Sequence, residues 1–111
     1  MYASVRKYEV HPERVEEFMH RLDAQFAPRL ERTPGFVAYQ VIDGGLDRAR
    51  ESRVFEITLY HDREAADRSA EMAAQFVDEE LADLGVERLE AATGGVSVSR
   101  AVSEVLEAAH A

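Results

Sequence analysis

Two spacings of apolar residues recur along the chain and predict the order of its secondary-structure elements. Four segments are rich in β-branched and aromatic side chains, which is typical of strands. They span residues 2–10, 36–43, 53–60 and 86–100. Residues 12–30 and 63–84 instead carry apolar side chains three and four positions apart, as one face of a helix does. The chain is therefore predicted to read strand, helix, strand, strand, helix, strand.

The ends of the two predicted helices are marked by residues that start or stop helices. Pro12 suits a first helical turn, and Pro34-Gly35 ends the first helix, because Pro cannot donate a backbone hydrogen bond and Gly accepts a positive φ. Pro28 lies inside the apolar pattern and is expected to kink the helix or to end its regular part. Asp62 is a plausible N-cap for the second helix, and Gly85 is placed to end it.

This order predicts a single α+β domain over residues 1–100, a ferredoxin-like β-α-β-β-α-β sandwich whose four-stranded antiparallel sheet carries two helices on one face. Within the last strand, Thr93-Gly94-Gly95 is expected to form a bulge or bend before the strand resumes at Val96. Residues 101–111 are a C-terminal tail that contains the pattern of a short helix.

Both faces of the predicted sheet carry apolar side chains. Phe36, Ala38 and Ile42 have one parity, while Val37, Tyr39 and Val41 have the other, and the third strand repeats this arrangement. Two helices cover only one face of such a sheet. We therefore expect a homodimer in which the open faces pack together into a dimeric α+β barrel, with a monomer that leaves this face open as the alternative.

Composition narrows the classes of function. The chain has 111 residues and a formal net charge of −9, which argues against a nucleic-acid partner and against docking on anionic lipid. The absence of cysteine excludes disulfides, thiolate catalysis and zinc–thiolate sites. No signal peptide and no apolar run long enough to span a membrane is visible, so a cytoplasmic location is the default expectation.

Several motifs together resemble the antibiotic biosynthesis monooxygenase-like domains of the dimeric α+β barrel superfamily. They are the helix that begins at Pro12, its apolar stripe, the turn Thr33-Pro34-Gly35-Phe36, and the helix entry from Tyr60 to Ala66. The resemblance covers residues 1–100. It implies a ferredoxin-like monomer and a family that includes cofactor-free oxygenases of polycyclic phenols and haem-degrading enzymes.

The resemblance also identifies which family chemistry this chain lacks. The haem-degrading members use an Asn on the first strand together with a Trp and a His towards the second helix. This chain contains no Trp and no Asn, and residues 63–84 contain no His. Haem degradation by the familiar mechanism is therefore not expected, and no metal, haem or other cofactor is predicted.

Three polar residues are the candidates for catalysis. His61, at the junction of the third strand and the second helix, is the predicted base, because imidazole titrates near neutrality. Arg6 and Tyr39 are predicted to hold a substrate oxygen anion. Each has a plainer interpretation: His61 as a cap or surface residue, Arg6 as an exposed sheet residue or the ion-pair partner of Glu9, and Tyr39 as a core residue.

A further set of residues is predicted to line an apolar cleft between the helices and the sheet. An apolar pocket with few polar groups is the usual site for an aromatic ligand. The predicted ligand-binding residues are Tyr8, Phe18, His20, Met72, Gln75 and Phe76. The alternative is a filled core without a pocket.

Three functions remain open from the sequence. The first is a cofactor-independent monooxygenase-like protein that binds a small aromatic or polyketide-type molecule between sheet and helices. The second is a non-catalytic ligand-binding or stress-response module, which needs the same pocket but no base. The third is a structural dimer with a closed core. Fold analogy alone does not choose among them.

Overall fold

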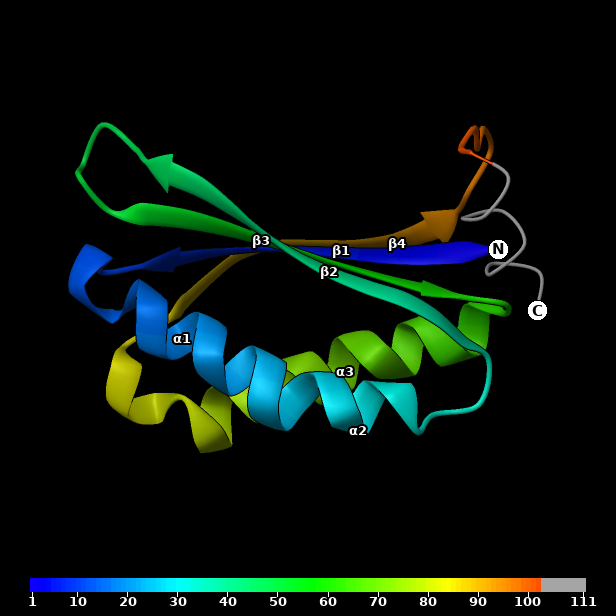
Figure 1. Ribbon diagram of the computed structural model, residues 1–111, viewed down its shortest axis with the longest axis horizontal. Coiled ribbons are helices and arrows are strands. Elements are labelled where there is room, and N and C mark those ends of the chain that lie inside the picture. Colours follow the sequence, from blue (N-terminus) through cyan, green and yellow to red (C-terminus); the bar gives the residue numbers. More distant parts are fainter. Residues whose placement is uncertain (103–111) are drawn as a thin grey trace.

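The computed structural model describes residues 1–102, which form a sheet layer above a helical layer (Figure 1). The strands are β1 (Tyr2–Val10), β2 (Phe36–Leu46), β3 (Ser52–Tyr60) and β4 (Glu87–Gly95). The helices are α1 (Val15–Arg21), α2 (Ala27–Glu31) and α3 (Arg63–Glu80), with short turns η1 (Pro12–Arg14), η2 (Leu22–Phe26) and η3 (Ala82–Leu84). All pairings are antiparallel and the strand order is β2-β3-β1-β4. The predicted ferredoxin-like fold class is confirmed.

The first helical segment runs from η1 to α2 and contains a π-turn where the sequence predicts a disturbance. The turn η2 is a π-helix, and the backbone N–H of Ala27 donates to the carbonyl of Leu22. Pro28 follows in the first turn of α2, where its missing N–H is tolerated. The helix therefore continues past Pro28 to Glu31 and ends before Gly35, which has a φ of 81°.

The core lies between this segment, α3 and the inner face of the sheet. Both predicted helical stripes are confirmed, because Phe18, Leu22, Phe26 and Leu30 on one segment and Ala73, Phe76 and Val77 on α3 are buried. The two helices meet through the stacked rings of Phe26 and Phe76, whose centroids are 5.0 Å apart. Asp62 caps α3 as predicted, since its Oδ1 accepts from the N–H of Ala65 at 2.8 Å.

The inner face of β3 is continuous, but a bulge changes the face of one residue on β2. The pairing of β2 with β3 shifts between Phe36 and Ala38. Phe36 therefore packs into the core with Tyr39 and Val41, and its predicted placement with Ala38 is wrong. The alternation of side chains between the two faces of a strand is interrupted at this point, because a bulge inserts one extra residue.

The last strand is shorter than predicted and its bulge is elsewhere. Thr93, Gly94 and Gly95 pair regularly with β1, whereas the register shifts between Lys7 and Tyr8, which leaves Leu89 of β4 without a partner. The predicted strand beyond Gly95 is wrong, because β1 has no residues left to pair there after Val96 N–H donates to the Met1 carbonyl.

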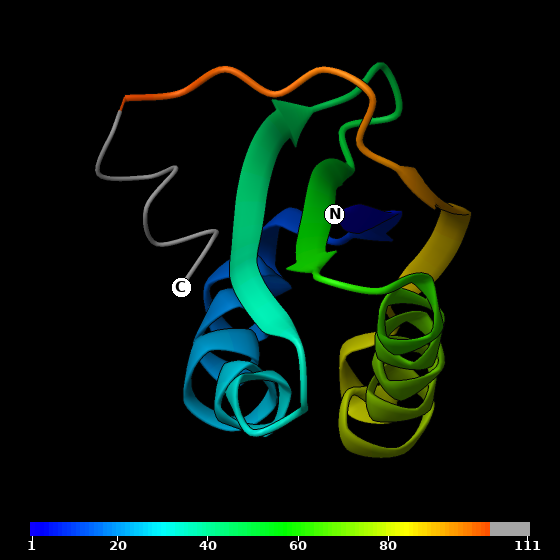
Figure 2. The same cartoon turned by 90° about the vertical axis from the view of Figure 1, so that its right-hand side faces the viewer.

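The segment after β4 leaves the sheet. Residues 96–102 pass above the sheet face opposite the helices, as the end-on view shows (Figure 2). Most of the predicted tail helix, residues 103–111, lies outside the described residues. None of the helices within residues 1–102 is both long and apolar enough to cross a membrane.

Candidate functional site

An ion pair is buried between the sheet and the helices. Arg6 of β1 and Glu56 of β3 occupy paired positions in the sheet, and both side chains point towards the helical layer. The Nε of Arg6 lies 3.2 Å from Oε1 of Glu56, and the two side chains are only 4% and 1% exposed. A charged pair at this depth persists only where further hydrogen bonds satisfy it.

Hydroxyl groups from three strands and α3 complete this network. Nη1 of Arg6 donates to Ser4 Oγ at 2.7 Å and to Thr58 Oγ1 at 3.2 Å. Thr58 is in turn 3.0 Å from Ser69 of α3. The hydroxyl of Tyr39, on β2, donates to Oε2 of Glu56. Both carboxylate oxygens of Glu56 are therefore engaged.

Two polar atoms beside this network have no hydrogen-bond partner among the residues that the structure describes. They are Nη2 of Arg6 and Oη of Tyr8, and both are buried. The side chains of Tyr8 and Arg6 lie on the same face of β1, two residues apart. A buried polar group without a partner costs about 1–3 kcal/mol. Such groups are rare in folded proteins, and here two of them belong to neighbouring inward-facing positions of β1.

Arg6 and Tyr8 also line a cavity of about 230 Å³ between α3 and the outer part of the sheet. Its wall on α3 is made of Ala70 and Ala74, and its wall on β4 includes Ala91. The remaining lining residues are Arg88, Leu89 and Glu90. Small side chains leave the space open, and the bulge at Leu89 lies in the same wall. Bulges occur often beside functional sites.

Arg88 connects the two walls of this cavity. Its Nη1 lies 3.1 Å from the carbonyl of Ala74 and 3.4 Å from Oδ2 of Asp78, both on α3. The side chains of Arg88 and Asp78 are 45% and 62% exposed. This exposed pair contributes little to stability, so the Arg88 guanidinium is the group at the cavity that changes partners most easily.

Burial fixes the protonation of the groups in the network. Burial raises the pKa of Tyr8 far above its ordinary value, and the nearby charge of Glu56 raises it further. The same two causes raise the pKa of Tyr39. Burial lowers the pKa of Arg6, but the Glu56 carboxylate outweighs this effect and the net shift is upward. Both phenols therefore stay protonated and Arg6 stays charged, so the network offers hydrogen-bond donors.

The structure brings some of the predicted site residues together. Arg6, Tyr8 and Tyr39 belong to one buried cluster, and the ring of Phe18 packs edge-on against Tyr8 with centroids 5.8 Å apart. His61 and His20 are exposed and do not line this cavity. His61 follows the last residue of β3, and its N–H donates to the carbonyl of Gly35.

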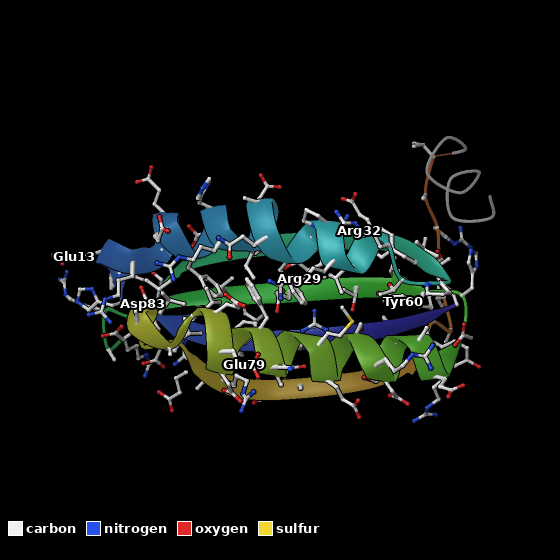
Figure 3. The ribbon with its side chains drawn as sticks, turned by 90° about the horizontal axis from the view of Figure 1, so that it is seen from below. Glu13, Arg29, Arg32, Tyr60, Glu79 and Asp83 are labelled. Carbon is white, nitrogen blue, oxygen red and sulfur yellow. The ribbon has the colours of Figure 1, made fainter. Side chains whose placement is uncertain are left out.

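The other predicted ligand-binding residues line a separate hollow. Met72, Gln75 and Phe76 contribute to a space of about 130 Å³ between α2 and α3. Figure 3 looks onto this helical face, and Arg29 lies between the two helices there, with its guanidinium carbon 5.1 Å from the centre of the Phe76 ring. Gln75 is exposed and donates to Glu79. All polar groups at this hollow reach solvent or a partner, so it is the weaker candidate for a built site.

Glu56 is the residue of the site that sequence reasoning missed. It stands in the middle of the apolar run from Val54 to Tyr60, where a carboxylate is costly unless a cation pairs with it. That exception in the strand is the signal that identifies it. No group of three or more His, Asp or Glu side chains suited to a metal ion occurs within residues 1–102.

Comparison with known proteins places the chain in a family. The sequence model of the antibiotic biosynthesis monooxygenase family matches residues 1–78. The protein therefore belongs to this family. No curated protein sequence matches the chain.

Solved structures share the fold at low sequence identity. HapK from Hahella chejuensis is 17% identical, with a TM-score of 0.69 over 93% of this chain and 100% of its own. A dimeric ferredoxin-like protein from an uncultured marine organism is 14% identical, with a TM-score of 0.64 over 91% and 99%. A mutant of SnoaB, a cofactor-independent oxygenase from Streptomyces nogalater, is 19% identical, with a TM-score of 0.60 over 88% and 94%.

The residues of the cavity do not fit haem, which the family's haem-degrading members use. Haem iron takes an imidazole, thiolate, thioether or tyrosinate ligand. The eight residues that line the cavity include no His, Cys or Met. Their one phenol, Tyr8, has a raised pKa and stays protonated. The cavity therefore offers haem iron no ligand.

Proposed function

We propose that this protein binds a small aromatic or polyketide-type molecule in the cavity beside Arg6 and Tyr8 and oxidises it with O₂ without a bound cofactor. One observation carries the proposal: two lining residues each hold a buried polar atom without a partner. A ligand oxygen that accepts from both atoms removes this cost. Membership of the monooxygenase family supports the choice of chemistry.

The oxidation that this site supports needs an anionic substrate. The substrate enolate transfers one electron to O₂, and the resulting carbon radical combines with superoxide to form a C–O bond. Protonation gives a hydroperoxide at a carbon that was a CH₂ group, and loss of water leaves a carbonyl. The balance is one CH₂ and one O₂ giving one C=O and one H₂O. The positive charge of Arg6 and the hydroxyl of Tyr8 stabilise the oxygen anion.

A non-catalytic binding protein is the second candidate, and the same observation supports it. The cavity and its donors hold a ligand whether or not O₂ reacts with it. The two functions differ in turnover, because a binding module consumes no O₂ above the rate of spontaneous oxidation.

The proposed assembly is a homodimer that joins the open faces of two sheets. Four apolar side chains occupy the centre of the open face, which has a shallow hollow of about 370 Å³. They are Val5, Phe55, Ile57 and Leu59. Val5, at the middle of β1, is 40% exposed. A strand face that meets water normally carries polar side chains, so an apolar side chain at this position suits a face that packs against a partner. The dimeric protein of similar fold supports this arrangement.

Oxygen uptake with a two-ring probe tests the proposed function. We choose 1,3-dihydroxynaphthalene at a pH where a substantial fraction of it is ionised; its keto tautomer carries an acidic CH₂, and its oxidation gives 2-hydroxy-1,4-naphthoquinone and water. The expected result is O₂ consumption above the protein-free rate, with one quinone formed for each O₂. Binding without uptake supports the non-catalytic function, and neither binding nor uptake contradicts both.

A cavity-filling variant controls for the place of the reaction. Ala74→Leu adds volume to the α3 wall without touching the polar network, and it is expected to abolish both binding and uptake. Ala82→Leu makes the same change on an exposed turn outside the cavity and is expected to have no effect. Equal activity in both variants would place the reaction elsewhere.

A further inference from the structure

Arg6 and Tyr8 line the cavity, and each carries a buried hydrogen-bond donor that has no partner among residues 1–102. Nη2 of Arg6 has only hydrogens to offer, and the hydroxyl of Tyr8 lies beside a carboxylate and a guanidinium whose other bonds are already made. Arg88 adds a second guanidinium at the wall formed by β4. The ligand atom that suits this arrangement accepts two hydrogen bonds at once and carries negative charge.

The residues around the cavity provide no group suited to taking a proton from the ligand. Glu56 already accepts from Arg6 at one oxygen and from Tyr39 at the other. Glu90 of β4 is paired in register with Lys7 of β1. Both residues line the hollow of the open face, on the side of the sheet away from the helices. Neither carboxylate is a free base directed into the cavity.

The histidines do not fill this role either. Within residues 1–102, His11, His20 and His61 are exposed, and none of them lines the cavity. Tyr8 and Tyr39 stay protonated, as burial and the charge of Glu56 raise the pKa of each. A proton that must leave the ligand therefore leaves before the ligand is bound.

The size and walls of the cavity limit the ligand further. A volume of about 230 Å³ lies below the range of about 300–1,000 Å³ that is common for drug-sized ligands. Ala70, Ala74 and Ala91 present methyl groups and no polar side chain. These walls suit the faces of a flat molecule with one or two rings.

We infer, building on the proposed function, that the ligand enters this cavity as a preformed oxygen anion: a one- or two-ring acidic enol, such as a hydroxyquinone or a cyclic β-dicarbonyl, and not a neutral phenol. Arg6 Nη2 and Tyr8 Oη donate to the anionic oxygen. Selectivity between ligands thus follows their acidity, and a simple phenol of the same size is rejected because the protein does not deprotonate it.

Isothermal titration calorimetry with three size-matched probes tests this inference near neutral pH. 2-Hydroxy-1,4-naphthoquinone is an anion under these conditions, 1-naphthol is a neutral phenol, and 1,4-naphthoquinone has no hydroxyl group. Hydrogen bonds to charged groups exceed neutral ones, so we expect the anion to bind about 10-fold or more tightly than the other two. Tyr8→Phe should weaken binding of the anion about 10-fold and should change the neutral probes much less.

The pH dependence gives a second readout. On lowering the pH, affinity for 2-hydroxy-1,4-naphthoquinone should fall with the ionisation of the free ligand, while affinity for 1,4-naphthoquinone should stay constant. Equal affinities for all three probes would overturn the substrate class and leave the binding site intact. Failure of all three to bind would overturn the proposed site as well. A pH profile set by a protein group would show that the cavity has its own base, which also overturns the inference.

Discussion

Arg6 and Glu56 face each other across β1 and β3 and form a buried ion pair, with Nε of the arginine 3.2 Å from Oε1 of the glutamate. Each residue lies on a strand that is otherwise rich in β-branched and aromatic side chains. The pair links three strands of the sheet, since Tyr39 of β2 binds Glu56 on one side and Ser4 of β1 and Thr58 of β3 bind Arg6 on the other. The sheet thus holds the guanidinium of Arg6, a residue that lines the cavity, in a fixed orientation.

Removing one partner of this pair should destabilise the protein strongly. Glu56→Leu leaves Arg6 charged and buried, and loss of one partner of a buried pair costs about 3–5 kcal/mol. The double variant Arg6→Leu/Glu56→Leu should lose less than the sum of the two single variants, because no charge is left unpaired. Chemical denaturation of the four proteins measures this coupling.

Glu64→Gln is the matched control for this prediction. Glu64 pairs with Arg68 on the exposed face of α3, and its side chain is 85% exposed. Its substitution should change the free energy of unfolding by less than about 0.5 kcal/mol. Additive losses in the double variant would show that the Arg6–Glu56 pair does not act as a unit.

Tyr8→Phe should leave stability unchanged or raise it slightly. The hydroxyl of Tyr8 is buried and has no partner in the free protein, so its removal breaks no bond and ends an unfavourable burial. Tyr60→Phe is the comparison, because that hydroxyl is hydrogen-bonded to Thr33 and its loss should cost about 1 kcal/mol. Thermal and denaturant unfolding measure both variants. A loss of about 1 kcal/mol or more in Tyr8→Phe would mean that the hydroxyl is satisfied without a ligand.

The element order was predictable because it depends on local spacing. The stripes from Val15 to Leu30 and from Ala65 to Leu84 read as helices without any knowledge of their partners, and both are buried in the core. The bulges were not predictable in the same way. Whether Val37 and Leu89 are the residues left unpaired depends on how the neighbouring strand aligns, and that alignment is a property of two segments together.

The site was predictable only in part for the same reason. Arg6, Tyr8 and Tyr39 were identifiable as polar groups on apolar strands, but Glu56, which binds Arg6 and Tyr39, lies 50 residues beyond Arg6 on another strand. The importance of His61 was inferred from its place between Tyr60 and the capping residue Asp62. That junction lies at the end of β3, where the chain turns outwards, so the imidazole is exposed.

Asp47 should make stability depend on pH in the acid range. Hydrogen bonds from the backbone N–H of Glu51, together with Arg53 and the N–H of Ala49, hold the pKa of Asp47 below its ordinary value of 3.8. A carboxyl group with a lowered pKa in the folded state stabilises the fold above its unfolded pKa, and this stabilisation is lost as the pH falls through the folded pKa. Asp47→Asn should therefore lower the unfolding midpoint near neutral pH, and the difference from wild type should shrink below about pH 4.

Asp23→Asn provides the reference for this titration. Asp23 lies on the exposed side of η2, away from the β2–β3 connection that Asp47 organises. Its substitution should leave the unfolding midpoint close to that of wild type at each pH. If the effect of Asp47→Asn stays constant down to strongly acidic solution, the charge of Asp47 is not what stabilises this connection.

A charge at the centre of the open sheet face should prevent the proposed dimer. Val5 pairs with Ile57 of β3 and with Ala92 of β4, so it lies in the middle of the apolar face. In a dimer that joins two such faces, Val5→Glu buries one more carboxylate from each copy in a desolvated interface, which is costly because the neighbouring Lys7 already lies opposite Glu90. We expect wild type to migrate as a dimer and Val5→Glu as a folded monomer in size-exclusion chromatography and native mass spectrometry.

Gln75→Glu adds the same charge to the exposed side of α3 and should remain dimeric. A monomeric wild type at micromolar concentration would mean that the apolar open face has another partner, and a dimeric Val5→Glu would place the interface on a different surface.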